Sequence, residues 1–371
     1  MERDELAAWL RLAMTPGVGR GSARKLLAAF GLPQNLFEQD AETLHAIVKA
    51  PQVQALRTEP DGWSAQVEAT WAWLQQEPSR RLLTLADPAY PPALLQTEDP
   101  PLMLYVSGVA VPEWPRAVSV VGSRNPTPQG ANNAREFARS FAQAGWTVVS
   151  GMALGIDAAA HEGALEGAAP GQVATVAVVG TGLDRVYPSQ HLQLAHRIAA
   201  NGLLVSEYPL GTPPHSENFP QRNRIIAALG QGTLVVEAAL RSGSLITARQ
   251  AAEQGREVFA IPGSIHSPQA RGCHELLRQG AKLVETAQDV MEELAPAAPA
   301  KRRATSGPAS APAPAESSLL QALGHDPVGL DALIARTGIS APDLQARLLE
   351  LELEGHVARL PGGLFQRLER G

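Results

Sequence analysis

Short apolar segments alternate with helical patterns between residues 117 and 279, and this alternation constrains the fold more than any other feature. The apolar segments are nearly continuous aliphatic runs, as in parallel strands buried on both faces. Parallel neighbours need a crossover, which the helical patterns supply. The expected strands are 117–122, 146–150, 173–180, 203–206, 233–237 and 257–261, and the expected helices are 130–144, 155–166, 189–201, 219–229, 244–254 and 272–279. The pattern predicts an α/β fold whose core is an extended Rossmann-like, doubly wound sheet.

Proline-rich segments divide the chain on both sides of this core. A length of 371 residues is enough for two or three domains. Residues 291–315 are rich in alanine and proline with few aliphatic anchors, so we expect a disordered linker there. The prolines within 86–101 suit an extended connection. The expected parts are a helical domain at 1–85, the core at 86–290, the linker at 291–315 and a small domain at 316–371.

The composition is that of a globular protein without a membrane span, since 44% of the residues are hydrophobic and 18% are charged. The acidic start of the chain lacks the pattern of a signal peptide, and the single cysteine, Cys273, excludes an internal disulfide. We therefore expect a cytoplasmic location. The net charge of −6 argues against nucleic acid, but residues 116–290 carry 14 Lys and Arg, 13 of them Arg, against 13 Asp and Glu. These arginines suit phosphate binding, and a GC-rich genome would explain them equally well.

Five turns that follow expected strands combine glycine with serine, threonine or arginine. They read VGSR (121–124), SGMALGID (150–157), GTGLD (180–184), RSGSLITA (241–248) and IPGS (261–264). The carboxyl ends of parallel strands meet at one edge of a sheet, where helix amino termini also present free N–H groups. The sequence therefore predicts an anion-binding rim along this edge. Its expected contact residues are Gly122, Ser123, Arg124, Arg241, Ser242, Gly243 and Ser244.

The segment ENFPQRNRIIAALG, residues 217–230, places arginines beside an aromatic ring. Arg222 and Arg224 flank Asn223, and Phe219 precedes them. Phosphate donors next to an aromatic face suit single-stranded nucleic acid, because the backbone follows a basic groove while bases stack on rings. The alternative is that Phe219 belongs to the core and that the arginines form ion pairs with Glu207 or Glu237.

Other kinds of site fit the sequence less well. A dinucleotide site would need G-x-G-x-x-G after Val121, and a nucleotide P-loop would need G-x-x-x-x-G-K-[ST]; neither occurs. Asp157 and His161 lie four residues apart on one helix face, but no third metal ligand or nucleophile motif accompanies them. We interpret Asp157 as a helix amino-terminal residue, His161 as a partner within the fold and Cys273 as a packed thiol. The sequence therefore predicts no cofactor, no metal and no catalytic residue.

The flanking regions carry two further patterns. In the amino-terminal part, Pro16-Gly17-Val18-Gly19 separates two apolar helical patterns, and Ser22 is placed to cap the second. Such a turn either offers N–H groups to a DNA phosphate or belongs to a structural helical hairpin, and the acidic surroundings favour the hairpin. The carboxy-terminal part fits a winged helix, with helices at 317–323, 328–336 and 341–354 and a two-stranded wing that turns at 361–363. Its third helix is acidic, which favours a protein contact or an accessory role over readout of duplex DNA.

The order of these motifs resembles that of the DNA-processing protein A (DprA/Smf) family. The similar segments are VVGSR, VVSGMALGIDAAAHEGAL, GTGLDRVYP, SEYPLGTPP, NFPQRNRII, VVEAALRSGSLITARQA, VFAIPGS and GCHELLRQGA, which span about 107–288. Family members often add a helical SAM-like domain before this core and a winged helix after it. The flanks of this chain agree with that organisation.

The resemblance implies a protein without catalytic activity that binds single-stranded DNA during natural transformation. Such a protein has little sequence preference, protects the incoming strand and helps to load the RecA recombinase. The resemblance makes Arg124 the best candidate for a DNA contact. The family's F-P-x-R-N-R motif is intact here. Its residues are Phe219, Pro220, Arg222, Asn223 and Arg224.

The resemblance also implies a homodimer formed through the core, near GCHELLRQGAKLV, with the RecA contact close by. Leu276 and Leu277 are then candidate interface residues, although ordinary helix packing explains them equally well. Several family members place lysines where this chain has Ser189 and Ser216, which implies fewer phosphate contacts here.

Two other functions stay open at this point. VVEAALRSGSLITA is faintly similar to nucleotide hydrolases of the lysine-decarboxylase-like Rossmann group, which would depend on Glu237. A winged-helix regulator with a ligand-sensing core is the second alternative. The family order of the motifs argues against the first, and the acidic third helix of the winged domain argues against the second.

Overall fold

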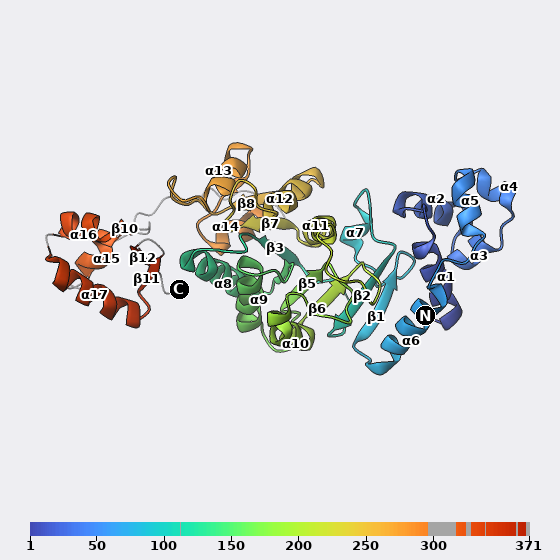
Figure 1. Ribbon diagram of the computed structural model, residues 1–371, viewed down its shortest axis with the longest axis horizontal. Coiled ribbons are helices and arrows are strands. Elements are labelled where there is room, and N and C mark those ends of the chain that lie inside the picture. Colours follow the sequence, from blue (N-terminus) through green and yellow to red (C-terminus); the bar gives the residue numbers. More distant parts are fainter. Residues whose placement is uncertain (112, 296–316, 324–327, 338, 361–362, 369–371) are drawn as a thin grey trace.

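A nine-stranded sheet forms the centre of the computed structural model, which describes residues 1–111, 113–295, 317–323, 328–337, 339–360 and 363–368. The strand order is β1-β2-β6-β5-β4-β3-β7-β8-β9 (Figure 1). The strands from β6 to β9 run parallel, whereas β1 and β2 form an antiparallel edge. Their bounds are β1 Arg80–Thr84, β2 Met103–Gly108, β3 Ala117–Val121, β4 Thr147–Ser150, β5 Thr175–Val179, β6 Leu203–Ser206, β7 Gly232–Val235, β8 Glu257–Ala260 and β9 Lys282–Leu283.

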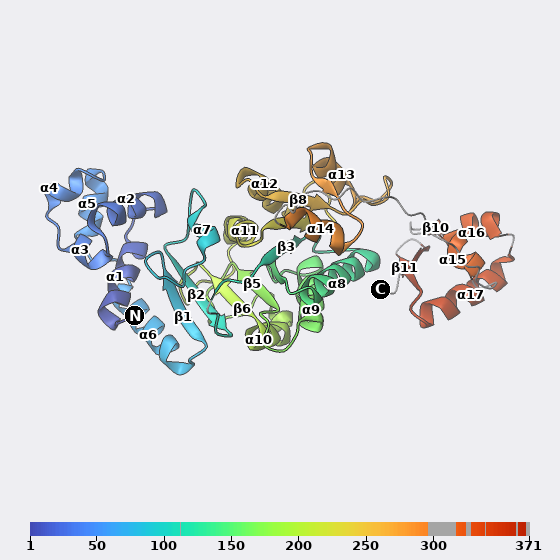
Figure 2. The same cartoon turned by 180° about the vertical axis from the view of Figure 1, so that it is seen from behind.

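Helices cover both faces of the sheet, as Figures 1 and 2 show. Val118 and Val120 of β3 pack with α8 and α9, whereas Ala117 and Val121 pack with α11, α12 and α13 on the other face. The helix bounds in the core are α7 Pro92–Leu95, α8 Pro128–Gln143, α9 Ile156–Gly167, the 3-10 helix η1 Ser189–His191, α10 Leu192–Asn201, α11 Asn218–Leu229, α12 Ser244–Glu253, α13 Arg271–Arg278 and α14 Ala287–Leu294. All six expected strands and all six expected helices are present, with ends shifted by a few residues. The predicted doubly wound α/β core is confirmed.

The amino-terminal helices pack on the antiparallel edge of the sheet. Their bounds are α1 Arg3–Met14, α2 Arg20–Phe30, α3 Pro33–Phe37, α4 Ala41–His45, α5 Ala50–Leu56 and α6 Trp63–Gln76. Tyr105 of β2 is fully buried against them and meets the Trp73 ring edge-on, with 5.9 Å between ring centroids. The sheet therefore begins inside the part expected at 1–85, because β1 pairs with β2 across the expected boundary.

Residues in and just after the glycine-rich turn between α1 and α2 contact other parts of the protein. Gly17 adopts the left-handed backbone conformation, with φ of +75°, and Gly19 precedes the first residue of α2. Ser22 does not cap this helix as expected, since it lies inside α2 and its hydroxyl accepts a 3.0 Å hydrogen bond from the Gln52 amide. The helix begins at Arg20, whose guanidinium forms an ion pair with Asp99 of the core at 2.6 Å. These contacts favour the structural hairpin.

Helix α14 runs four residues into the segment expected as a linker at 291–315, because it ends at Leu294. Met291 and Leu294 of this helix pack against the hydrophobic core, so the folded core domain extends beyond residue 290. The rest of the expected linker, from 296 on, lies outside the described residues. No helix among the residues described is long and apolar enough to cross a membrane.

The carboxy-terminal residues form three helices and a small antiparallel sheet, as expected for a winged helix. The bounds are α15 Ser317–Leu323, β10 Val328–Gly329, α16 Leu330–Thr337, α17 Ala341–Leu353, β11 Val357–Leu360 and β12 Leu364–Arg367. β12 lies between β10 and β11. Residues 361–362 of the expected wing turn lie outside the described residues. The small carboxy-terminal domain has its own hydrophobic core, in which Leu333, Leu344 and Leu348 are fully buried.

Candidate nucleic-acid interface

A cavity of about 550 Å³ opens at the carboxyl ends of β3 and β7, next to the amino terminus of α12. Nine of the eleven expected DNA-contact residues line it. They are Gly122, Ser123, Arg124, Arg222, Asn223, Arg241, Ser242, Gly243 and Ser244. Parallel β3 and β7 are neighbours, so their following turns meet at this point although they are far apart in the sequence. Phe219 and Arg224 are absent from the lining.

In the turn after β3, the side chain of Ser123 is buried and that of Arg124 is exposed. Gly122 is packed so closely that a Cβ atom would lie 2.9 Å from the carbonyl oxygen of Glu237. Ser123 is buried, its N–H donates to that carbonyl at 2.7 Å, and its hydroxyl lies 3.3 Å from the Gln269 amide oxygen. Arg124 is exposed. Of the two side chains expected here as DNA contacts, Arg124 is therefore accessible, whereas Ser123 is occupied within the protein.

The turn into α12 supplies the opposite wall of the cavity. Arg241 and Gly243 are exposed, and the hydroxyl groups of Ser242 and Ser244 lie 2.7 Å apart. Ser244 begins α12, where the first N–H groups of a helix favour an anion. Arg124 and Arg241 thus bring two guanidinium groups to one cavity.

Arg222 differs from the expected phosphate donor, because only 3% of its surface is exposed. Its guanidinium donates to the carbonyl of Gly151 at 2.7 Å and to that of Val178. Burial lowers the pKa of Arg222 to about 10, and the neighbouring carboxylate of Asp157 opposes that shift. Arg222 therefore connects the turn after β4 to the last residues of β5 beneath the cavity, and its guanidinium is already engaged in the protein interior.

Arg224 also differs from the expectation, because it is engaged in an ion-pair network. Its Nη2 atom lies 2.5 Å from both carboxylate oxygens of Glu207, and its Nη1 donates to the carbonyl of Asp99 at 2.6 Å. Arg20 reaches the same Glu207 at 3.0 Å. The pairing of Arg224 with Glu207 is the alternative that the sequence left open. Asn223 lies between the two arginines, half-buried at the cavity wall.

Three side chains form a continuous row beside the cavity. The Arg124 guanidinium carbon lies 5.8 Å from the centroid of the Phe219 ring, and the Tyr187 ring follows at 5.5 Å between centroids with 31° between planes. Phe219 is half-buried, whereas Tyr187 is 47% exposed. Gly180 leaves room for Phe219, since a Cβ atom there would lie 3.1 Å from the ring. We call Arg124, Phe219 and Tyr187 the stacking row.

Tyr187 was not expected from the sequence as a site residue. The sequence did place Tyr187 directly after the third glycine-rich turn, within RVYP. That turn lies at the same edge of the sheet as the other expected contact residues, so Tyr187 could have been found from its position. The signal was weak because Tyr187 and Phe219 are 32 positions apart in the sequence.

The titratable residues near the cavity have structural partners. Asp157, in the first turn of α9, accepts hydrogen bonds from the N–H groups of Gly151 and Ala153 at 3.1 and 3.3 Å, and burial raises its pKa. His161 is fully buried 2.7 Å from the Thr175 hydroxyl, and burial lowers its pKa to about 3. Burial likewise raises the pKa of Cys273 to about 12, far above the range of a reactive thiol. The structure agrees with the three interpretations, since Asp157 lies at the amino terminus of α9, His161 has a partner within the fold and Cys273 is a buried thiol. The described residues contain no group of three metal-ligating side chains.

Glu237, on which a hydrolase would depend, caps the start of α8. Its carboxylate accepts from the Thr127 N–H at 2.9 Å and from the Thr127 hydroxyl at 2.6 Å. A Cβ atom at Gly130 would lie 2.3 Å from this carboxyl group, so the helix closes over it. Glu237 is absent from the lining of the carboxyl-end cavity.

A second groove, of about 330 Å³, lies between α12 and α13. Leu276 lines it but is 92% buried, and Leu277 packs partly buried against the core. Leu240 and Leu245 complete the apolar side, and Leu240 is 56% exposed. Helix packing thus accounts for most of the surface of the two expected interface leucines, while Leu240 is the open apolar side chain.

Comparison with known proteins identifies the family of the core and of the small domain. Residues 81–295 match the model of the DNA recombination-mediator protein A family, and residues 303–363 match the DprA winged helix domain. Protein Smf of Escherichia coli is 42% identical over 311 residues, which are 82% of this chain and 81% of that protein. DNA processing protein DprA of Bacillus subtilis is 41% identical over 57% of this chain and 70% of its own.

Two solved structures are also similar. DNA processing protein A from Streptococcus pneumoniae superposes with a TM-score of 0.65 at 34% identity, covering 79% of this chain and 98% of its own. The second is DNA processing protein A from Helicobacter pylori, known for a single-stranded DNA binding mode, with a TM-score of 0.52 at 33% identity over 58% of this chain and 95% of its own. The matched family model covers more than half of the sequence. The chain therefore belongs to the DNA recombination-mediator protein A family.

Proposed function

We propose that the protein binds single-stranded DNA of any sequence along the carboxyl-end edge of the sheet, as a DNA processing protein of natural transformation. The observation that carries the proposal is the stacking row, which places an exposed guanidinium beside two aromatic rings at the rim of the cavity. Phosphates would bind Arg124, Arg241 and the start of α12, while unpaired bases stack on the rings. A backbone-and-stacking mode has little sequence preference, and no catalytic step is needed.

Three observations support this proposal over nucleotide hydrolysis. Two arginines of different turns, Arg124 and Arg241, line the carboxyl-end cavity. Its buried carboxylate, Asp157, is occupied by backbone N–H groups. Glu237 is held by Thr127 at the start of α8. The lysines that several family members carry are replaced by Ser189 and Ser216, so we expect affinity to rest on arginine and on stacking.

Replacing Tyr187 by alanine tests the stacking part of the proposal. We expect single-stranded DNA to bind about 5- to 150-fold more weakly, the equivalent of about 1–3 kcal/mol for one stacked base. Tyr187→Phe keeps the ring and should bind like the wild type. Because no phosphate contact is lost, the dependence of affinity on salt should be the same in both variants.

Oligonucleotides with abasic sites separate stacking from a general loss of structure. Fluorescence anisotropy should show that abasic sites weaken wild-type binding, and that the weakening is smaller in Tyr187→Ala. An equal penalty for abasic sites in both proteins would contradict stacking on Tyr187. Tighter binding to duplex than to single-stranded DNA would contradict the proposed function as a whole.

We further propose that the protein acts as a homodimer and delivers its DNA strand to RecA, with both contacts near α13. The groove between α12 and α13 supports this proposal, because it exposes Leu240 next to Leu276. An exposed apolar side chain that borders a groove is typical of a contact between proteins. The soluble, cytoplasmic location that such a role requires also remains a proposal.

A charge at Leu240 tests this surface. We expect Leu240→Arg to shift the wild-type dimer toward monomer in analytical ultracentrifugation and to reduce capture of purified RecA, because a cation would be desolvated in an apolar contact. Leu192→Arg is the control, since Leu192 is 49% exposed on α10 and outside the groove. A wild-type mass for Leu240→Arg, or a monomeric wild type, would rule out the interface at this groove.

A further inference from the structure

A cavity of about 790 Å³ lies at the amino ends of the parallel strands, opposite to the proposed DNA edge. Ala117 begins β3, Gln231 precedes β7 and Arg256 precedes β8, and all three line it. Its volume lies within the range of about 300–1,000 Å³ that is usual for small-molecule sites. Its floor is apolar, formed by Val149, Val176 and Leu229.

One wall of this cavity carries polar side chains that have no partner within the described part of the chain. Arg256 is half-buried, and its side chain makes no hydrogen bond or ion pair with any described residue. Burial without a counter-ion lowers the pKa of Arg256. The Gln231 backbone N–H is fixed on the carbonyl of Ala117 at 2.8 Å, while its carboxamide is exposed and has no described partner. A partly desolvated guanidinium such as that of Arg256 favours an anionic ligand, and the exposed carboxamide of Gln231 can add a hydrogen bond to it.

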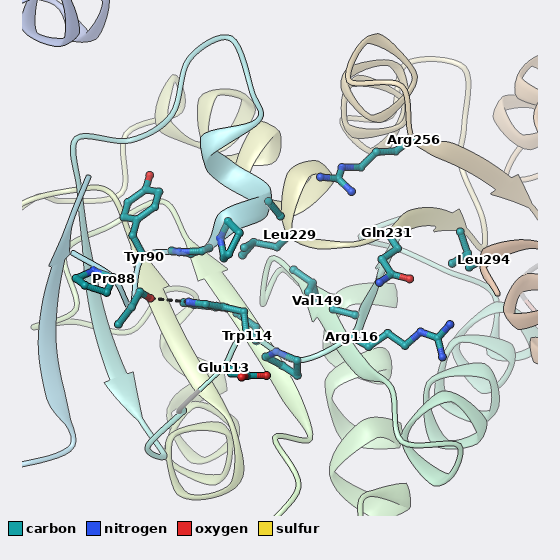
Figure 3. A pocket seen from close by; sticks show the side chains of 17 residues that line it. Pro88, Tyr90, Glu113, Trp114, Arg116, Val149, Leu229, Gln231, Arg256 and Leu294 are labelled. Carbon is teal, nitrogen blue, oxygen red and sulfur yellow. Dashed lines mark hydrogen bonds between the residues drawn. The ribbon is translucent and has the colours of Figure 1, made fainter. Parts of the chain in front are cut away.

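The other wall is aromatic and held in place. The indole N–H of Trp114 donates to the carbonyl of Ala89 at 2.8 Å, and the hydroxyl of Tyr90 donates to the carbonyl of Pro101 at 2.7 Å. Figure 3 shows Trp114 and Tyr90 on one side of the cavity, with Arg256, Gln231 and Arg116 on the other. Trp114 is partly exposed, whereas Tyr90 is buried. The indole N–H of Trp114 is therefore already hydrogen-bonded, and the face of its ring is available for an apolar contact.

Two further charges stand at the rim. The guanidinium carbon of Arg116 lies 4.2 Å from the centroid of the Trp146 ring, and Figure 3 shows it directed away from Trp114. Glu113 is exposed beside Trp114. The cation inside the cavity is thus Arg256, while the single carboxylate of the lining lies at the opening.

We propose that this amino-end cavity binds a nucleotide, with the base against Trp114 and the phosphate on Arg256. A flat apolar face and a guanidinium on opposite walls match the two ends of a nucleotide. Gln231 adds an amide that can donate to and accept from a base edge or a sugar hydroxyl. The ligand is either a free mononucleotide or one nucleotide of a single strand. The proposal does not depend on the DNA edge, because the two cavities share no lining residue.

The test is calorimetric titration of deoxyadenosine monophosphate into the full chain carrying Arg124→Ala, which weakens the carboxyl-end cavity. We expect binding at one site, weakened about 10- to 100-fold by adding Arg256→Ala and less by adding Arg256→Lys. Trp114→Phe should retain most of the affinity and Trp114→Leu should lose it. Arg249→Ala is the matched control, since Arg249 is exposed on α12 outside this cavity.

Competition distinguishes the two sources of the nucleotide. Displacement of the bound monophosphate by a single-stranded oligonucleotide would assign the cavity to a unit of a strand, and a lack of displacement would assign it to a free nucleotide. The proposal is overturned if the monophosphate does not bind at millimolar concentration, or if Arg256→Ala binds it like the parent protein. It is also overturned if inorganic phosphate binds as tightly as the monophosphate, because the base would then contribute nothing.

Discussion

Arg124→Ala is expected to weaken binding of single-stranded DNA more than any other single change at the carboxyl-end cavity. Arg124 is exposed at the cavity rim and stacks on Phe219 at 5.8 Å. Its loss removes a phosphate contact and exposes the ring that it covers. A hydrogen bond to a charged group contributes about 1.5–3 kcal/mol, so we expect affinity to fall by about 10- to 150-fold.

The dependence of affinity on salt identifies the lost contact as electrostatic. Each phosphate neutralised on a single strand contributes about −0.7 to the slope of log affinity against log salt, so Arg124→Ala should flatten the slope by about that amount. Fluorescence anisotropy across a salt series measures it. Arg197→Ala, which removes an exposed arginine of α10, should leave affinity and slope unchanged. A full wild-type slope in Arg124→Ala would mean that Arg124 does not contact phosphate.

The architecture of the core could be predicted because the alternation of apolar strand patterns and helical patterns is local and recurs along the chain. Strands such as β3 are buried at every position, so each reads as a continuous apolar run. The edge pair β1 and β2 was not expected, because β1 reads RRLLT rather than as a continuous apolar run and lies beside a helical domain whose packing the sequence does not reveal. β1 nevertheless pairs with β2 over five residues, and Tyr105 of β2 joins the helical domain to the sheet.

The gathering of the candidate residues at one cavity could be predicted, but the environments of the two arginines in the F-P-x-R-N-R motif could not be predicted from composition alone. Glycine-rich turns of parallel strands must meet at one edge, so nine expected residues line one cavity. Arg222 and Arg224 look equivalent in a motif, whereas on a helix they are two residues apart and face different directions. Arg222 shares the helix face of Ile225, Ile226 and Leu229, which are buried. Helical spacing therefore held the signal that Arg222 points into the core.

The pairing of Arg224 with Glu207 was one of the alternatives open in the sequence, but its contacts with Asp99 and Arg20 had no comparable signal. Its partners Glu207 and Asp99 are 17 and 125 residues away in the sequence, and Arg20 joins them from the amino-terminal helices. Only the folded chain brings these charges together. The network connects α11, which carries the F-P-x-R-N-R motif, to the first helical hairpin, so the orientation of that hairpin is fixed by the helix beneath the DNA edge.

Arg222→Met is expected to destabilise the protein by about 3–5 kcal/mol while leaving the salt dependence of DNA binding intact. Methionine replaces the apolar stem but removes the hydrogen bonds that the guanidinium donates to the carbonyls of Gly151 and Val178, at about 1–3 kcal/mol for a buried group left unpaired. It also removes the cation that favours ionised Asp157 in the interior. Urea unfolding measures the loss. Arg197→Met, an exposed control on α10, should change stability by less than about 0.5 kcal/mol.

The two arginine variants give opposite patterns if their assigned roles are correct. Arg124→Ala should lose salt-dependent affinity at nearly constant stability, because Arg124 is exposed. Arg222→Met should lose stability, and its folded fraction should bind DNA with the wild-type salt slope, because a buried guanidinium releases no counter-ions from DNA. A slope flattened by about 0.7 in Arg222→Met, with stability unchanged, would show instead that Arg222 leaves the core to contact phosphate.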